Sequence, residues 1–255
     1  MSKLKKEHQF LDLSDYMRNP ARVVATWFLP TPFRAITFTW LFFICGLLSC
    51  YFIVQERPFF AVLCLLLKIL FDTVDGEIAR LSNEPRYTGR YLDSNCDLVL
   101  NASFFYSFYL IDGSHFWLYT LSFLSLSLQC SLYNYYYVVK RAATNGDTTS
   151  RVFEFKAPKA FDYESQFWVN VLHKVYLFFY GWQDLIVHCF DSNVKGDSLS
   201  KGFLCAVSVF GLGIQLLAII IFILLKSPLL AIVYFLGISN VYVVFLVVYR
   251  KLFYK

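Results

Sequence analysis

Four aspartates in one short stretch of this 255-residue chain have the spacing of two facing helix surfaces. The stretch, residues 72–97, reads DTVDGEIARLSNEPRYTGRYLDSNCD. A helix turns about 100° per residue, so the first half places acidic and small side chains on one stripe: Asp72, Asp75, Gly76 and Ala79. In the second half the fixed residues recur at every fourth position and share a face: Gly89, Asp93 and Asp97. Two helices are therefore expected to direct four carboxylates into one gap.

Clustered carboxylates beside apolar helices are costly unless cations neutralise them. All-oxygen clusters suit hard ions, so the pattern predicts a site for Mg²⁺ or Mn²⁺ formed by the four aspartates. Mg²⁺ keeps coordination positions open for water and substrate phosphates, which favours a diphosphate ligand. The small residues Gly76, Ala79 and Gly89 would let such a ligand approach the helix backbone. The positively charged guanidinium group of Arg80 would bind its phosphates. Glu77 faces away from the stripe and is excluded as a ligand.

Any one aspartate or arginine at a helix end is more often a solvated cap or an ion-pair partner than a functional residue. The joint spacing of all eight fixed positions, which include the small residues as well as the charged ones, rarely arises by chance, so the set as a whole favours function. Lys68 lies one turn before Asp72 on the same stripe, and intramembrane charges usually pair. Lys68 is expected to be a counter-ion of Asp72. The other interpretation is that Lys68 contacts a phosphate group of the substrate.

The elements that carry these residues are predicted to be membrane helices. The chain is 58% hydrophobic and 16% charged, with a mean hydropathy of +0.52, which is more apolar surface than a soluble core of this size can bury. A spanning helix needs about 20 mostly apolar residues. Six stretches are expected to span: 35–54, 58–80, 89–111, 113–139, 202–225 and 227–249. The fold class is thus an all-α integral membrane protein, and no broken helix or paired half-repeat is visible in the sequence.

Two further amphipathic segments are expected to lie in the membrane interface. One is the N-terminal helix within residues 10–30, and the other is residues 166–190, between the fourth and fifth spans. The second segment could be taken for a seventh span, but its central uncharged run is too short. We expect one domain over residues 1–255, with residues 1–34 and 141–201 at the cytoplasmic surface.

The distribution of basic residues predicts the orientation. All but three of the 23 lysines and arginines fall on one side of the six-span arrangement, which places both termini and the acidic site in the cytoplasm. These residues are spread over many loops and form no patch, so a nucleic-acid partner is not expected. The seven cysteines show no paired metal-type spacing and are expected to be reduced packing residues.

The spacing D-x2-D-G-x2-A-R-x8-G-x3-D-x3-D resembles, without exception, that of the CDP-alcohol phosphotransferases (CDP-alcohol phosphatidyltransferases), which make glycerophospholipid headgroups. The resemblance implies a homodimer, two metal ions and CMP as the leaving group. It implies metal ligation by Asp72, Asp75 and Asp93. Asp97 would share the metal shell and act as general base, and Gly76, Ala79 and Arg80 would contact the CDP moiety.

The expected function is transfer of a substituted phosphate from a CDP-linked donor to an alcohol acceptor in phospholipid synthesis. CDP-diacylglycerol is the favoured donor, and a soluble CDP-alcohol acting on a lipid acceptor satisfies the same motif. The acceptor stays open, because the sequence after the fourth span retains Lys140 and Arg141 but lacks an acidic partner. An intramembrane prenyltransferase predicts a second aspartate-rich motif, and an ion-coupled transporter predicts broken helices or half-repeats; neither feature is evident in the sequence.

Overall fold

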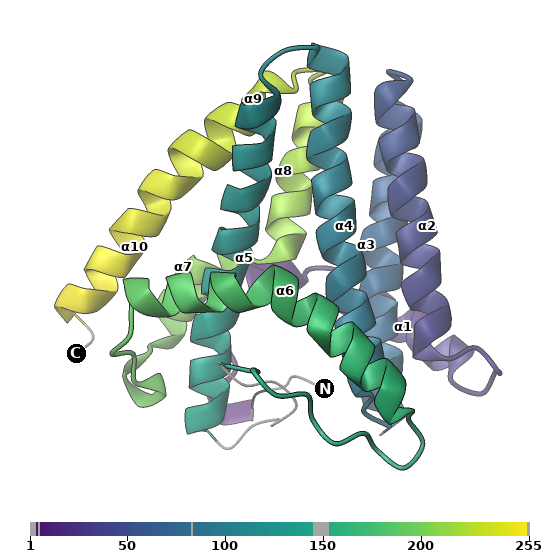
Figure 1. The fold of residues 1–255 in the computed structure, drawn as a ribbon, viewed down its shortest axis with the longest axis vertical. Coiled ribbons are helices and arrows are strands. Elements are labelled where there is room, and N and C mark those ends of the chain that lie inside the picture. Colours follow the sequence, from purple (N-terminus) through teal and green to yellow (C-terminus); the bar gives the residue numbers. More distant parts are fainter. Residues whose placement is uncertain (1–3, 5, 83, 145–152, 254–255) are drawn as a thin grey trace.

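The computed structural model describes residues 4, 6–82, 84–144 and 153–253, and these contain helices and no strands. Five helices stand roughly side by side as an upright bundle (Figure 1). They are α2 (Ala35–Val54), α3 (Pro58–Leu81), α4 (Tyr87–Asp112), α5 (Phe116–Ala143) and α8 (Leu212–Leu224). α2 packs against α3 and α4, and α8 packs against α3. The first four predicted spans therefore correspond to continuous helices, with the fourth beginning at Phe116 after a turn at residues 113–115.

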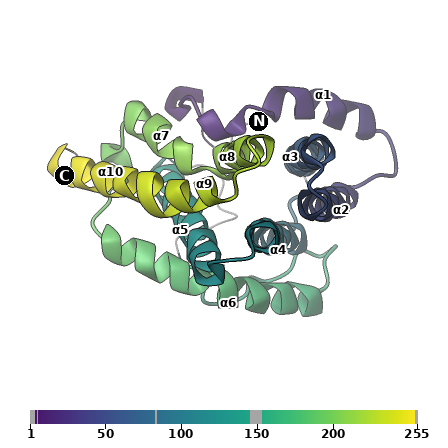
Figure 2. The same cartoon turned by 90° about the horizontal axis from the view of Figure 1, so that it is seen from above.

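Two helices lie across the outside of this bundle on opposite sides (Figure 2): α1 (Arg18–Phe28) and α6 (Gln166–Phe190). α1 is amphipathic, and it buries Ala21 and Ala25 against Val74 and Ile78 of α3. Pro20 lies in its first turn, and the helix ends two residues before Pro30, as expected for a segment punctuated by prolines.

α6 packs against α4 and α5 and exposes a row of large apolar side chains on its outer face. The exposed residues include Phe167, Trp168, Phe178, Trp182 and Leu185. Both helices predicted outside the bundle therefore form, and each has one buried and one exposed face. Their position in the membrane interface stays a prediction.

The predicted fifth span, residues 202–225, is broken, so the expectation of an unbroken helix there was wrong. α7 (Lys201–Val207) and a short 3₁₀ turn (Ser208–Phe210) are separated from α8 by Gly211, and the two parts are bent by 42°. The N-terminal segment occupies the bend. A Cβ atom on Gly211 would lie 2.3 Å from Ser14 Oγ, and Tyr16 donates a hydrogen bond of 3.3 Å to the carbonyl of Gly213. The glycines thus admit a chain segment from nearly 200 residues earlier.

The last predicted span is a run of helix from Leu229 to Phe253, formed by α9 (Leu229–Ile232), a π-helical stretch (Val233–Ile238) and α10 (Ser239–Phe253). Among the described residues, this run and α2 are long and apolar enough to cross a membrane, and α7 with α8 would add a third crossing if the bent pair is one span. α3 is interrupted by the charged residues Lys68, Asp72 and Asp75 and is therefore not one of these apolar helices. The six-span topology therefore stays a prediction.

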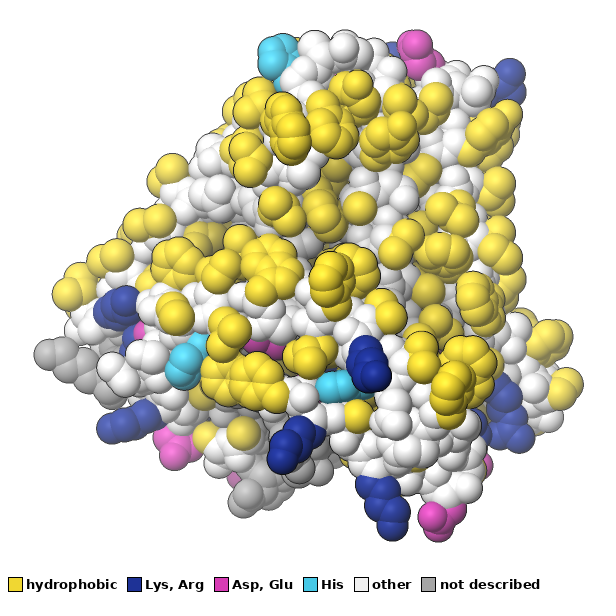
Figure 3. All heavy atoms as spheres, viewed as in Figure 1, with side chains coloured by type: hydrophobic (Ala, Val, Ile, Leu, Met, Phe, Trp, Pro, Cys, Tyr) yellow, Lys and Arg dark blue, Asp and Glu magenta, His cyan; other side chains and the backbone are white. Residues whose placement is uncertain are grey.

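The surface agrees with a membrane environment. Hydrophobic side chains cover the upright helices, whereas most lysines and arginines on the visible face gather in the lower part (Figure 3). α1, the start of α4 and the end of α10 all lie in that lower part (Figure 1). The apolar helices thus support an integral membrane protein whose more polar end includes the beginning of α4.

Candidate active site

Three of the four predicted aspartates converge from two helices. Asp72 comes from α3, and Asp93 and Asp97 come from α4, one turn apart on the same face. One carboxylate oxygen from each lies within 4.8 Å of the others, and all three side chains are only partly buried. Hard, oxygen-binding cations take such ligand sets, so the residues present fit a divalent metal ion.

A buried lysine joins this acidic cluster from α3. The ammonium group of Lys68 lies 2.7 Å from Asp72 Oδ2 and 2.6 Å from Asp97 Oδ1, and it also lies 5.0 Å from the centre of the Phe42 ring. The predicted pairing with Asp72 is confirmed. The second pairing, with Asp97, was not predicted, and it ties α3 to α4 at the level of the cluster.

Asp75, the remaining predicted ligand, is more deeply buried than the other three. It is 7% exposed, and its carboxylate accepts a short hydrogen bond from the hydroxyl group of Thr39 on α2. It does not belong to the group of three whose oxygens converge within 4.8 Å. Its carboxylate still interacts electrostatically with those of Asp72 and Asp97. Thr39 was missed in the sequence because nothing in the local pattern of α2 marks it.

Gly76 lies beneath the side chain of Arg80. A Cβ atom at Gly76 would lie 3.2 Å from Nη2 and 3.3 Å from Nη1 of Arg80, so the absence of a side chain lets the guanidinium group lie close to the helix. Arg80 Nη2 donates a hydrogen bond of 2.7 Å to Glu77, which is fully buried. Glu77 is therefore no member of the acidic cluster, as predicted, and its role in holding Arg80 is new.

The N-terminal segment contributes to the same charged network. Arg18 Nε lies 3.7 Å from Glu77 Oε1, and the guanidinium group of Arg18 also pairs with Asp15 at 2.5 Å. Burial raises the pKa of Asp15 to about 6, and the positive charge of Arg18 opposes that rise. The network connects α1 to the part of α3 that carries the predicted nucleotide contacts.

The two other predicted contacts, Ala79 and Gly89, lie near the ends of α3 and α4 that face each other across the connecting turn. A Cβ atom at Gly89 would approach only Cβ of Arg86, at 3.7 Å, so the space beside this glycine is open. Ala79 is partly exposed. Both positions leave room for a ligand next to the helix backbone.

Lys140, one of the two basic residues that directly follow the fourth predicted span, is buried. It is 8% exposed, and its ammonium group donates a hydrogen bond of 2.9 Å to the carbonyl oxygen of Leu199. This lysine therefore supports the packing of α5 against the segment that precedes α7. All seven cysteines are free thiols, as expected.

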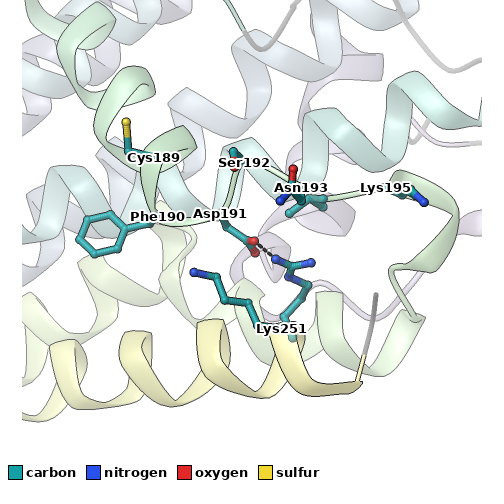
Figure 4. A pocket seen from close by; sticks show the side chains of 9 residues that line it. Cys189, Phe190, Asp191, Ser192, Asn193, Lys195 and Lys251 are labelled. Carbon is teal, nitrogen blue, oxygen red and sulfur yellow. Dashed lines mark ion pairs between the residues drawn. The ribbon is translucent and has the colours of Figure 1, made fainter.

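A pocket of about 800 Å³ lies elsewhere, between the end of α6 and the end of α10 (Figure 4). Its acidic residue, Asp191, forms an ion pair with Arg250 and accepts a hydrogen bond of 2.8 Å from Tyr136. The pocket shares no residue with the acidic cluster. Because its one carboxylate is already engaged, it offers no comparable place for a metal ion.

One comparison with known proteins gives a match. The model of a protein family described as CDP-alcohol phosphatidyltransferase matches residues 33–161, which is just over half of the chain and includes all four aspartates of the motif. Neither the curated proteins nor the solved structures contain a match to the chain. The matched region begins just before α2 and ends at residue 161, between α5 and α6.

Proposed function

Because the chain belongs to the CDP-alcohol phosphatidyltransferase family, we propose that it transfers a phosphatidyl group from CDP-diacylglycerol to an alcohol, with release of CMP. The family consists of transferases of phospholipid synthesis, so a transferase activity follows from membership. The observation that carries the proposal is the convergence of Asp72, Asp93 and Asp97 from two helices within the matched region.

The proposed metal ligands are Asp72, Asp75, Asp93 and Asp97, which together would hold two Mg²⁺ or Mn²⁺ ions. The four carboxylates and the ammonium group of Lys68 carry a net charge of about −3 when ionised. Such a charge is best matched by multivalent cations, and two divalent ions leave one positive charge for an anionic substrate. When bound, the ions would neutralise the diphosphate of the donor and the charge that develops on CMP.

The chain itself would supply the base and the nucleotide contacts. The oxygen atom of the acceptor alcohol forms a bond to phosphorus, the bond from phosphorus to the CMP oxygen breaks, and the hydroxyl proton passes to the Asp97 carboxylate. Gly76, Ala79 and Gly89 would let the CDP group approach the helices. Arg80, oriented by Glu77, would contact its phosphates.

The proposal includes the environment of the site. We place the protein in the membrane with six spans, as a homodimer, with both termini and the acidic cluster in the cytoplasm. Lipid around the bundle would deliver a donor with acyl chains directly to a site at the beginning of α4. The basic residues concentrated at that end support this orientation.

The test is CMP release by the purified full-length protein in detergent micelles. CDP-diacylglycerol is supplied with Mg²⁺ and, in separate reactions, with serine, inositol, glycerol, glycerol phosphate and inositol phosphate. We expect CMP release that depends on one of these acceptors and disappears with a chelator. A parallel reaction contains CDP-choline or CDP-ethanolamine with diacylglycerol. CMP release only in that reaction would replace the proposed donor by a soluble CDP-alcohol.

The rival functions from the sequence receive no support from the site. The break between α7 and α8 resembles the discontinuous helices of transporters, but residues of the N-terminal segment fill it, and the acidic cluster lies on α3 and α4. The described residues show one cluster of three convergent carboxylates, whereas a prenyltransferase would need a second aspartate-rich motif. No CMP release from either class of donor would overturn the proposed function.

A further inference from the structure

Residues 153–165, which we call the strap, run from the polar segment after α5 to the start of α6 and contact the beginning of α4. Their last acidic residue, Glu164, accepts three hydrogen bonds there. Its Oε1 accepts from the backbone N–H of Thr88 at 2.8 Å and from the Thr88 hydroxyl at 2.6 Å, and its Oε2 accepts from the N–H of Tyr87 at 3.1 Å. Glu164 therefore caps the N-terminus of a helix that lies 76 residues earlier.

α4 depends on this distant cap because its own sequence supplies none. The first four N–H groups of a helix have no partner within the helix, and Arg86, which precedes α4, makes no capping hydrogen bond with its side chain. A carboxylate at this position also interacts favourably with the positive end of the helix dipole. Glu164 provides both the acceptor oxygens and the negative charge.

The other end of the strap binds the next turn of α4. Glu154 accepts a short hydrogen bond from the guanidinium group of Arg90 and one of 3.0 Å from the hydroxyl of Tyr91. The backbone oxygen of Glu154 lies 2.6 Å from His173 Nε2 on α6. The side chains of Arg90 and Glu154 are only 18% and 10% exposed, so solvent screens this pair weakly.

Aromatic rings of the strap also pack at the beginning of α4. Tyr87 stacks on Phe161 at 5.0 Å between ring centres, and Phe161 stacks on Tyr163 at 5.5 Å. The hydroxyl group of Tyr163 donates to the carbonyl of Pro85 at 2.7 Å, and Arg86 lies over its ring. The strap is thus packed on the turn between α3 and α4 as well as on α4 itself.

α6 continues the same contact along α4, past the first metal ligand of that helix. Tyr180 donates a hydrogen bond of 2.8 Å to the carbonyl of Ser94, and the Asn95 amide donates one of 3.3 Å to the carbonyl of Leu172. Ser94 and Asn95 lie between Asp93 and Asp97. Two segments after α5 therefore hold the part of α4 that presents both aspartates.

We infer that the strap is a positioning element for the metal site, in which Glu164 fixes the first turn of α4 so that Asp93 and Asp97 stand opposite Asp72. This inference rests on the proposed function, because it assumes that the cluster binds divalent metal. Glu164 and α6 lie beyond the family match, which ends at residue 161. Glu154 and Phe161 of the strap fall within that match, so the contacts outside it are the cap formed by Glu164 and those made by α6.

The expected effect follows from the demands of the metal. Mg²⁺ requires nearly ideal octahedral geometry, so a small displacement of Asp93 relative to Asp72 weakens binding. Loss of an outer partner that orients metal ligands typically costs about 10-fold to 100-fold in metal affinity. Glu164→Gln keeps the size of the side chain, but its amide nitrogen cannot accept a hydrogen bond and its charge is gone. We expect about a 10-fold loss of affinity for this variant.

The experiment measures binding of Mn²⁺ to the full-length protein in micelles by the electron paramagnetic resonance signal of the free ion. Asp162→Asn is the matched control, since it removes an equal charge from an exposed residue of the same strap. Hydrogen exchange of the peptide that spans residues 85–93 is measured on the same samples. We expect weaker Mn²⁺ binding and faster exchange in Glu164→Gln, with both unchanged in Asp162→Asn.

Three results would overturn the inference. Faster exchange with normal Mn²⁺ affinity would leave the strap a structural support only, and unchanged exchange would show that Glu164 does not hold α4. If wild-type protein binds no Mn²⁺, both the metal assignment of the proposed function and the positioning role are wrong. The exchange data would still show separately whether Glu164 caps α4. If Glu164→Gln does not fold, Thr88→Val removes one of the three hydrogen bonds and is expected to give a smaller loss of Mn²⁺ affinity.

Discussion

Lys68 of α3 forms an ion pair with Asp97 of α4, with 2.6 Å between its ammonium nitrogen and Oδ1. The same nitrogen lies 2.7 Å from Asp72 Oδ2, so one buried cation contacts two of the three convergent carboxylates. It reduces the repulsion between α3 and α4 when no metal ion is bound. It also places a positive charge close to where a metal ion would bind, so the lysine and the metal oppose each other electrostatically.

The first prediction is that Lys68→Met makes stability depend strongly on metal. Removal of one partner from a buried ion pair typically costs about 3–5 kcal/mol, and we expect less here because the side chain of Asp72 is 23% exposed. In chelator the variant should therefore unfold at a lower temperature than wild type. Added Mn²⁺ should recover most of this difference, because the metal no longer competes with the ammonium group.

The measurement is thermal unfolding in micelles with chelator and with saturating Mn²⁺. Lys174→Met, which removes an exposed lysine from α6, is the control and should behave as wild type in both conditions. An equal stabilisation by Mn²⁺ in Lys68→Met and in wild type would show that Lys68 is not coupled to the metal site.

The second prediction separates the base from the ligands. Asp97→Asn should lower turnover by about 10² to 10⁴, the usual contribution of a positioned carboxylate that accepts a proton, while most of the affinity for metal and donor remains. Asp72→Asn and Asp75→Asn should weaken metal and donor binding directly, because each removes an anionic ligand. CMP release and donor binding are compared for the three variants. Near-normal turnover in Asp97→Asn, or loss of donor binding as complete as in Asp72→Asn, would exclude Asp97 as the base.

The convergence of the acidic cluster could be predicted because helical periodicity is a local property. The spacing of Asp93 and Asp97 places them on one face whatever surrounds α4, and the motif turn brings this face toward Asp72. Partners from distant segments were not accessible to the same reasoning. Thr39 reaches Asp75 across 36 residues and Glu164 reaches Thr88 across 76, and neither residue belongs to a periodic pattern that would mark it.

The break at Gly211 shows a second limit of the sequence. Hydropathy measures how apolar a segment is, and residues 202–225 are mostly apolar and contain no charge, so the pattern predicted one spanning helix. The bend depends on Ser14 and Tyr16, which pack into it from the far end of the chain. Two glycines in an apolar run are compatible with either a continuous or a broken helix. The packing of the N-terminal segment decides between the two.

The third prediction concerns the orientation of Arg80. Glu77→Gln should raise KM for the CDP-linked donor more than it lowers kcat, because Arg80 loses the charged partner that holds it over Gly76 and would contact donor phosphates less often. Arg18 keeps its ion pair with Asp15 but loses the charged partner that links α1 to α3. Steady-state kinetics with varied donor provide the measurement. Glu84→Gln is the control, since Glu84 lies in the connection between α3 and α4 and pairs with exposed Arg86. Similar kinetics in both variants would contradict the orienting role.

The last prediction is a pH dependence of stability that comes from Asp184 on α6. Burial, together with the negative charge of Glu154 on the strap, raises the pKa of this carboxyl from 3.8 to about 7, although the positive charge of Arg90 on α4 opposes the rise. Between pH about 4 and 7 the folded protein therefore retains a proton that the unfolded chain has released. The folded state binds more protons over this interval, so the contribution of Asp184 to stability falls as pH rises and is constant above pH about 7.

Asp184→Asn keeps this side chain neutral at every pH. Its unfolding temperature in micelles should match that of wild type near pH 4, exceed it by a growing margin up to pH about 7, and keep that margin at higher pH. The measurement is a series of thermal unfolding curves in chelator, so that metal binding does not contribute its own pH dependence. Asp197→Asn, at an exposed aspartate, should show no such trend. A margin that stays constant with pH, or that favours wild type at high pH, would mean that Asp184 is ionised throughout and that Arg90 outweighs the combined effects of burial and Glu154.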